Sequence, residues 1–458
     1  MTAVEDVSTT PAQRRERRAW YFYDWANSAY VTTTGAVLFA PYLTSVAERS
    51  ACGFSGTPER PCRQDLSVLG LSVSAGSLVF YVITVTTLAS AVVLPVVGAL
   101  ADRSAAKHRM LAGFAWVGSL AAASMCLVTG SSWQLGAALL FVANVCLGAS
   151  LVVYDALLCE IATPEERDAV SSRGWALGYL GGGVLLAANL ALVTAHDAVG
   201  ISTETAVRVS LLSAGLWWGL FTVIPFRGLR RLPRREAADS AAGPGRGSFA
   251  QLASTLRGAR RYPMTLLFLL AYLFYNDGIQ TVIGAASVYG AKQLGLETSF
   301  LIAAILVVQF VAFGGALLFG RLAARFGSKR AIVGGLVVWM VVVSAGYLLP
   351  EGRPLPFLAL AVAIGVVLGG TQALSRSFYS QLVPRGREAE YFSLYQACER
   401  GTSWLGTLVF GLVHQWTDSY RPAIVALVGF FAVGLALLVR VDARRAVADA
   451  GNPVPRNL

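Results

Sequence analysis

Long apolar stretches separated by short polar segments run from residue 20 to residue 441. A helix needs about 20 mostly apolar residues to cross ~30 Å of hydrocarbon, and lipid-exposed backbone must satisfy its own hydrogen bonds. None of the stretches shows the residue-by-residue alternation of a membrane β-barrel strand. We therefore predict twelve membrane-spanning helices, at residues 20–46, 75–100, 110–129, 133–158, 173–194, 207–225, 263–285, 299–320, 331–349, 356–382, 392–415 and 421–440.

The composition agrees with this pattern. Hydrophobic residues make up 55% of the chain and charged residues only 14%, against about 25% charged in soluble proteins. We expect an all-α polytopic membrane protein whose surroundings are the lipid bilayer. The sequence contains no phosphate-binding P-loop and no Cys/His cluster with metal-ligand spacing. It therefore favours no cofactor, no metal and no enzyme activity.

The net charge of +11 is explained by its distribution along the chain. Basic residues concentrate in segments that would share one side of the membrane, which is the positive-inside pattern. They are Arg14, Arg15, Arg17 and Arg18, then Arg103, Lys107 and Arg109, then nine more from Arg227 to Arg261, then Arg321, Arg325, Lys329 and Arg330. The pattern predicts that both termini are cytoplasmic, in a plasma (inner) membrane. A nucleic-acid partner is then unnecessary.

The chain divides into two related halves. We predict a cytoplasmic tail at 1–19, a six-helix half at 20–225, a basic cytoplasmic linker at 226–262, a second six-helix half at 263–441 and a cytoplasmic tail at 442–458. Thr-Pro at 163–164 and Val-Pro at 383–384 stand at matching offsets before the fifth and eleventh spans. Such repeats are typical of transporters whose halves rock about a central site. The expected oligomeric state is a monomer.

Two motifs resemble known families. Gly98-Ala99-Leu100-Ala101-Asp102-Arg103 resembles the loop motif of the major facilitator superfamily, and the second copy has Ala324 where an acid might stand. The segments 23–30 (YDWANSAY) and 275–281 (YNDGIQT) resemble signatures of the UMF1 family, which includes the vacuolar effluxers related to autophagy in yeast. The resemblance covers residues 20 to about 441 and implies a major facilitator fold and transport. Because the family is associated with efflux of amino acids from the fungal vacuole, an amino acid is one candidate substrate.

Asp277 is the first candidate for a functional site. It lies fourteen residues into the seventh span, or about 21 Å along a helix, and an ionisable group at membrane depth is costly. Thr281 lies one turn away on the same face, and Asn276 and Gln280 repeat that spacing on the adjacent face. Because burial favours the neutral form of a carboxylate, Asp277 is predicted to exchange a proton or bind a cation. The alternative is a structural hydrogen bond to another helix.

Asp24 differs, because it lies only about one turn into the first span. That depth predicts a place in a cytoplasmic gate. Asn27 and Ser28 continue the same helix face toward the interior, and Tyr30 is expected to face the cavity.

Further charged residues occur at the ends of the fourth, tenth and eleventh spans. Asp155 or Glu399 is predicted to pair with Arg376 or Arg400 across helices, as a gate or as a permanent pair. Asp102 and Arg103 are expected to control conformation, with Asp102 capping an adjacent helix. Cys52 and Cys62 share the longest outside loop, where a disulfide and two free thiols both remain open.

These features predict a secondary transporter that moves a small organic solute by alternating access, coupled to a proton or cation. Acidic and basic side chains on the same faces suit a zwitterion such as an amino acid. An uncoupled facilitator and a transporter-fold sensor without transport are the alternatives. The sequence does not determine the direction of transport.

Overall fold

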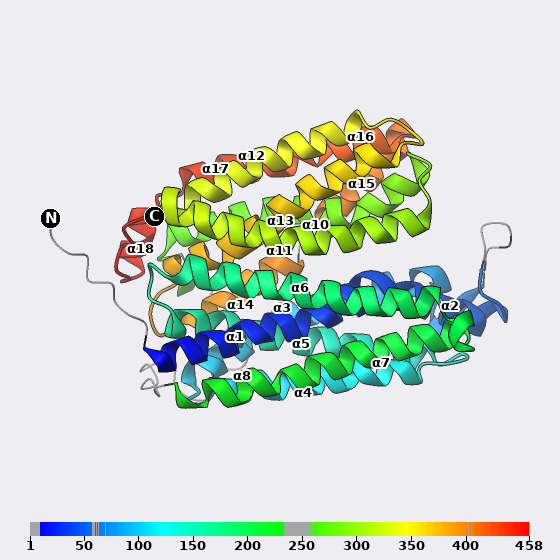
Figure 1. Cartoon of the computed structure of the whole chain (residues 1–458), viewed down its shortest axis with the longest axis horizontal. Coiled ribbons are helices and arrows are strands. Elements are labelled where there is room, and N and C mark those ends of the chain that lie inside the picture. The colour runs from blue at the N-terminus through cyan, green and yellow to red at the C-terminus, as the bar shows by residue number, and fades with distance from the viewer. Residues whose placement is uncertain are drawn as a thin grey trace.

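The computed structural model describes residues 10–457 except 57–59, 61, 63, 69, 233–256, 259 and 402. Most of the predicted linker 226–262 therefore lies outside the described residues. Two bundles of long helices lie side by side, one built from each half of the chain (Figure 1). Both described ends of the chain lie at one end of the molecule, which we call the termini face (Figure 1).

The amino-terminal bundle is built from residues 10–232. Its long helices pack pairwise, with α4 against α5 and α7, and α1 against α6. In chain order its elements are α1 (Pro11–Ala29), the π-helix η1 (Tyr30–Leu38), α2 (Phe39–Cys52), α3 (Leu78–Arg103), α4 (Lys107–Ser124), α5 (Trp133–Ile161), α6 (Arg167–Thr194), α7 (Thr203–Phe221) and α8 (Val223–Gly228), with short 3-10 turns at Ala75–Ser77, Met125–Leu127, Asp197–Val199 and Leu229–Arg231.

The carboxy-terminal bundle is built from residues 260–457. Its elements are α10 (Pro263–Lys292), α11 (Thr298–Phe326), α12 (Ser328–Tyr347), α13 (Pro354–Leu382), α14 (Glu388–Gly401), α15 (Ser403–Thr417), α16 (Tyr420–Ala426), α17 (Val428–Arg440) and α18 (Ala443–Asp449). The bundles meet where α6 packs on α11 and where α3 packs on α14.

Ten helices of the described residues are long and apolar enough to cross a membrane. The predicted first span, 20–46, is interrupted, because it passes from α1 through η1 into α2. The predicted eleventh span, 392–415, covers parts of α14 and α15, on either side of residue 402, which lies outside the described residues. A π-helix carries wider turns than an α-helix and is frequently found at functional sites.

The first helix begins earlier than the predicted first span. Pro11 starts α1, well inside the predicted tail 1–19, because Thr10 and Gln13 form a reciprocal capping box and Pro11 takes the first helical position. The tail after the last span is also partly helical. Asp442 caps α18 by accepting from the Arg445 backbone N–H.

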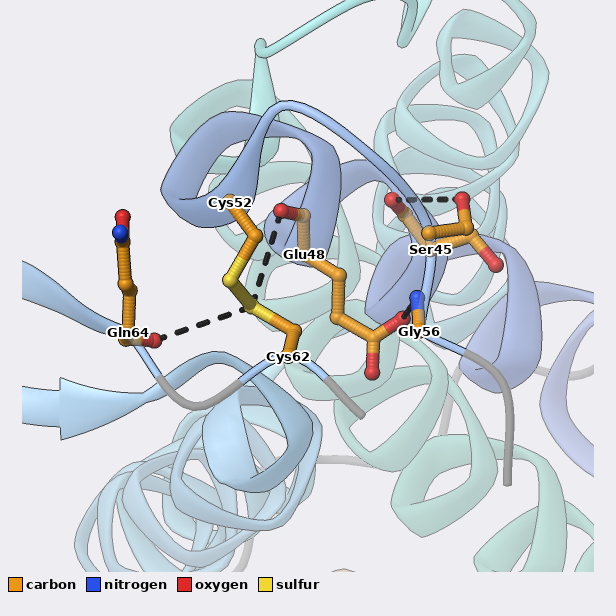
Figure 2. The surroundings of a disulfide bond; sticks show 7 residues. Ser45, Glu48, Cys52, Gly56, Cys62 and Gln64 are labelled. Atoms are coloured by element: carbon orange, nitrogen blue, oxygen red, sulfur yellow. Dashed lines mark hydrogen bonds between the residues drawn. A yellow bond between two sulfur atoms is a disulfide. The ribbon is translucent and has the colours of Figure 1, made fainter. Parts of the chain in front are cut away.

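The opposite end carries a feature that the apolar pattern did not predict. A two-stranded antiparallel hairpin, β1 (Asp65–Val68) and β2 (Leu71–Ser74), follows the longest loop, and we call this end the hairpin face (Figure 1). The structure joins Cys52 and Cys62 in a disulfide, with their Cα atoms 5.9 Å apart. Figure 2 shows this bond tying the end of α2 to the loop, beside Glu48, whose carboxylate accepts from the Gly56 backbone N–H.

Candidate functional site

A buried arginine on α13 joins the two bundles on the termini side of the molecule. Arg376 is 2% exposed. Its guanidinium donates to Asp24 of α1 at 3.0 Å, to Asp155 of α5 at 3.4 Å and to the Ser171 hydroxyl of α6 at 3.0 Å. We call these four residues the Arg376 latch. All three partners belong to the amino-terminal bundle, so separating the bundles at this end breaks every one of these bonds.

Aromatic rings enclose the latch. The centre of the Arg376 guanidinium lies 4.8 Å from the Trp20 ring, 5.3 Å from the Tyr154 ring and 5.3 Å from the Trp175 ring. Guanidinium groups over aromatic faces gain cation–π attraction, and the rings exclude water. The Tyr154 hydroxyl also donates to Asp24 at 2.7 Å. The latch is therefore a dry contact in which one cation serves two carboxylates.

The latch includes one of the predicted pairs, Asp155 with Arg376. It adds Asp24, which was expected at a gate but had no assigned partner. Asp24 could not be matched from the sequence, because 352 positions separate it from Arg376 and no spacing rule links them. Gly174 is the local signal, since a Cβ there would lie 2.6 Å from the Asp24 carboxylate. A larger residue in α6 would displace the acid.

Asp102 makes a second contact between the bundles at the termini face. Its carboxylate accepts the backbone N–H groups of Ala389 and Glu390, both at 2.9 Å, in the first turn of α14. Lys107 lies 3.6 Å from the same carboxylate. A Cβ at Gly98 would lie 2.5 Å from the Ala389 carbonyl oxygen, so only glycine permits this approach. Arg103 ends α3 directly beside Asp102.

The matching turn between α11 and α12 lacks an acid, as noted at Ala324. The structure supplies the carboxylate from the other side of that interface. Asp168, in the first turn of α6, accepts from the Ser328 hydroxyl at 2.5 Å and from the Ser377 hydroxyl at 2.6 Å. Each of the two equivalent contacts thus contains one carboxylate, and both carboxylates belong to the amino-terminal bundle. Asp102 lies in the last turn of α3, whereas Asp168 lies at the start of the facing helix, α6. Sequence reasoning did not single out Asp168, although Glu388 stands at the matching offset in the second half, because no pattern showed that its carboxylate would reach Ser328 and Ser377.

One ion pair at the termini face lies within the amino-terminal bundle. Arg17 of α1 forms a two-pronged pair with Glu166, with one N–H···O contact of 2.9 Å. Burial acts to raise the pKa of Glu166, but the hydrogen bonds from Arg17 and Thr163 outweigh it, so the pKa of this carboxyl is lowered.

Two cavities extend from the latch toward the hairpin face. Their volumes are about 330 Å³ and about 390 Å³, and both are lined by Val31, Ala36, Gln280 and Glu399. The first continues to Leu301 and Phe357, near the starts of α11 and α13. The second includes Tyr30 and Arg400. η1, α10 and α14 therefore surround a shared central space, which we call the central cavity.

The structure divides the predicted site residues. Gln280, Ser28 and Tyr30 line the central cavity, as do Glu399 and Arg400, which were predicted as gating residues. The remaining four predicted residues, Asn27, Asn276, Asp277 and Thr281, do not line either cavity. On α10 the residues that line the first cavity begin at Gln280 and continue to Tyr289.

Asp277 is buried against another helix of its own bundle. One carboxylate oxygen accepts from the Gly406 backbone N–H of α15 at 2.8 Å, and the other has no hydrogen-bond partner among the described residues. The Thr281 hydroxyl also has no partner there. Asn276 donates to the Glu399 carbonyl oxygen at 3.2 Å, and Asn27 donates to the Tyr23 carbonyl oxygen at 2.6 Å. Asp277 and Asn276 thus bond to backbone groups of other helices within the carboxy-terminal bundle.

One bond across the bundles lies inside the cavity itself. The Gln309 amide of α11 donates to the Thr32 hydroxyl of η1 at 2.8 Å. Both residues line the first cavity. Sequence analysis did not single out Gln309, because a lone glutamine in an apolar span carries no motif.

Two six-helix bundles that meet around a central cavity, with a polar latch at one end, have the architecture of the major facilitator fold. Solved structures show the same fold. The human organic anion transporter MFSD10 gives a TM-score of 0.69 at 14% identity, covering 94% of this chain and 100% of that one. The Escherichia coli fucose:proton symporter gives 0.64 at 12% identity, covering 95% of this chain and 98% of that one. The predicted all-α major facilitator fold is confirmed.

The family follows from sequence similarity. The model of the "Vacuole effluxer Atg22 like" family matches residues 12–451, so the chain belongs to that family. An uncharacterised MFS-type transporter of Bacillus subtilis is 31% identical over 430 residues, covering 93% of this chain and 95% of the relative. Autophagy-related protein 22-1 of Penicillium rubens is 24% identical, covering 96% of this chain and 92% of the relative. The predicted family is confirmed, and the chain is an integral membrane transporter.

Proposed function

We propose that this protein is a secondary transporter that moves a zwitterionic small molecule, an amino acid being the candidate, by alternating access around the central cavity. The observation that carries the proposal is the adjacent pair Glu399 and Arg400 on α14, both of which line the cavity. A carboxylate and a guanidinium side by side offer partners for an ammonium and a carboxylate on one ligand. Gln280 adds a neutral amide from α10.

The conformation of the bundles supports alternating access. The latch closes the termini side, while the cavity extends from it toward the hairpin face. Moving the cavity opening to the termini face requires that Arg376 leave Asp24, Asp155 and Ser171 together. Breaking an ion pair in a buried site leaves uncompensated charge, so a free-energy barrier opposes opening of the termini side.

Proton coupling belongs to the same proposal, with Asp277 as the coupling residue. Support comes from its depth in α10 and from the carboxylate oxygen that has no partner among the described residues. The uncoupled facilitator is the second candidate. It is favoured by the Gly406 contact, which gives Asp277 a structural role.

Counterflow in proteoliposomes tests the substrate. Vesicles that contain the protein are loaded with a mixture of the common amino acids. They should exchange these for one or more radiolabelled amino acids added outside. Glu399→Gln and Arg400→Met should each lower exchange at least tenfold, because each loses a charge-assisted bond worth about 1.5–3 kcal/mol. Glu297→Gln, an exposed carboxylate at the start of α11, is the matched control and should exchange normally.

Absence of exchange for every amino acid in a protein that still unfolds cooperatively would overturn the amino-acid proposal. Exchange that persists in both variants would overturn the site assignment.

Orientation is part of the proposal as well. We infer that the termini face is cytoplasmic and that the protein resides in the plasma membrane, on the positive-inside distribution of arginine and lysine. A cysteine introduced in the linker 226–262 should resist an impermeant maleimide in intact cells and react in inverted vesicles. Labelling from outside intact cells would contradict the orientation.

A further inference from the structure

A single glutamine lies between the central cavity and the Arg376 latch. Gln396 of α14 is 2% exposed. Its amide nitrogen donates to Asp155 at 2.8 Å and to Glu399 at 3.1 Å, and its amide oxygen accepts from Arg400 at 3.3 Å. The amide therefore uses both of its N–H groups and its oxygen at once. Two of its partners line the cavity and the third belongs to the latch.

The bond to Asp155 crosses between the bundles, since α5 and α14 belong to different halves. It adds to the bond that Arg376 makes with the same carboxylate. The bonds to Glu399 and Arg400 stay within α14. These two partners set which way the amide faces, because Arg400 requires the oxygen and Glu399 requires the nitrogen. If the amide turned over, its oxygen would face the Asp155 carboxylate, and the attraction would become repulsion.

We propose that Gln396 couples occupancy of the cavity to the latch. This inference rests on the proposed function, in which Glu399 binds a ligand ammonium and Arg400 binds a ligand carboxylate. A zwitterion bound there competes for both groups that orient the Gln396 amide. The amide then holds Asp155 less firmly, and the latch loosens toward the termini face. Gln396 is thus a positioning residue, which acts on the bundle interface through its neighbours.

The charges around Gln396 explain why a neutral amide occupies this place. Three carboxylates, Asp24, Asp155 and Glu399, share the region with two guanidiniums, Arg376 and Arg400. An acid at position 396 would add a fourth carboxylate, and a base would compete with Arg376 for Asp155. Only a group that donates twice and accepts once satisfies all three neighbours.

The test needs no ligand, because Glu399→Gln imitates a carboxylate whose charge has been neutralised. Its amide oxygen still accepts from Gln396, but a neutral bond has about half the strength of a charge-assisted one. Spin labels are attached to cysteines introduced in place of Ala105 and Arg330, exposed positions at the termini face on different bundles. The cysteines outside the disulfide are replaced, namely Cys126, Cys146, Cys159 and Cys398. Distances between the labels report opening of this end.

We expect Glu399→Gln to shift the ratio of long to short distances about fivefold or more, the lower range of typical coupling. In the Gln396→Met background the same substitution should shift it less than about twofold. Gln372→Met is the matched control. It removes another buried amide of the carboxy-terminal bundle, one bonded to Asn276 and not to the latch, and should leave the Glu399→Gln shift intact.

An equal shift with and without the Gln396 amide would overturn the proposal, and so would no shift in any background. If Gln396→Met fails to yield monodisperse protein, Gln396→Leu replaces it in the same cycle. Loss of amino-acid exchange with a normal distance cycle would instead contradict the proposed substrate and leave the coupling role supported.

Discussion

Asp24 and Asp277 stand in similar sequence signatures on the first helices of the two halves, yet their surroundings differ. Asp24 binds Arg376 of the opposite bundle, within a contact that exists only while the termini side is closed. Asp277 binds the backbone of α15 in its own bundle, so its partner moves with it. A carboxylate paired across the bundles reports and stabilises one conformation, whereas a carboxylate paired within a bundle is indifferent to rocking. The same signature thus serves two physical roles.

The largest effect is expected from Arg376→Met. It leaves Asp24 and Asp155 buried without their cation, and breaking a buried pair from one side costs about 3–5 kcal/mol. Thermal unfolding of the purified protein should show this loss, while Arg445→Met, at an exposed pair on α18, should not.

The triple variant Arg376→Met, Asp24→Asn, Asp155→Asn should recover most of that stability, because no unpaired charge remains. Failure of the triple variant to recover would show that the aromatic enclosure, and not charge pairing, dominates the latch.

Asp24→Asn should weaken the latch without leaving an unpaired charge on α1. The amide still accepts from Tyr154, but Arg376 retains only Asp155 as a charged partner. The termini-closed state then loses a charge-assisted bond of about 1.5–3 kcal/mol and is populated less. Because each cycle of counterflow must return through that state, the rate of amino-acid counterflow should fall about tenfold or more. Asp197→Asn, whose side chain is 94% exposed in the same bundle, is the control. An unchanged rate in Asp24→Asn would remove this residue from the gate.

Asp277→Asn should act on coupling and not on the latch. The amide oxygen can still accept from the Gly406 N–H, so the fold should persist, but an amide does not exchange a proton at neutral pH. Uptake of the amino acid under an imposed pH gradient should fall to the level of uptake without a gradient. Normal gradient-driven accumulation in this variant would overturn the proton-site proposal and favour the facilitator.

A smaller effect is expected at Asp102. Its two bonds cap the first turn of α14 from the other bundle, and losing a cap costs about 0.5–2 kcal/mol. Asp102→Ala should lower thermal stability by that amount, and Asp102→Asn should restore part of it, because an amide oxygen still accepts. Equal losses for both variants would indicate that the Lys107 contact matters more than the cap.

The smallest effect concerns Glu166, a carboxyl paired within one bundle outside the membrane spans. Because its pKa in the folded protein is lowered, the pair stabilises the fold above the ordinary pKa of glutamate, and that contribution is lost as pH falls through the lowered pKa. Glu166→Gln should reduce the acid dependence of unfolding between about pH 6 and about pH 3. An unchanged acid profile would contradict the assigned pairing.

The fold was largely predictable, because a membrane imposes long apolar helices and the repeats impose two halves. The site was predictable only in part. Helical spacing placed Gln280 toward the cavity but could not fix how α10 rotates, so Asp277 was expected where Gln280 stands. The pairing of Asp24 with Arg376, like the bonds of Asp168 across the interface, depends on how the two bundles dock. The hairpin at 65–74 and the division of the first span at η1 also lie beyond hydropathy, since both depend on local hydrogen bonding.

The most direct test of the comparison measures the distance between spin labels at Ala105 and Arg330 in three proteins: the parent, Asp24→Asn and Asp277→Asn. If Asp24 holds the bundles together and Asp277 does not, Asp24→Asn should increase the population of long distances about fivefold or more, the scale of a lost conformational coupling. Asp277→Asn should match the parent. A shift in Asp277→Asn as large as that in Asp24→Asn, or no shift in Asp24→Asn, would contradict the account.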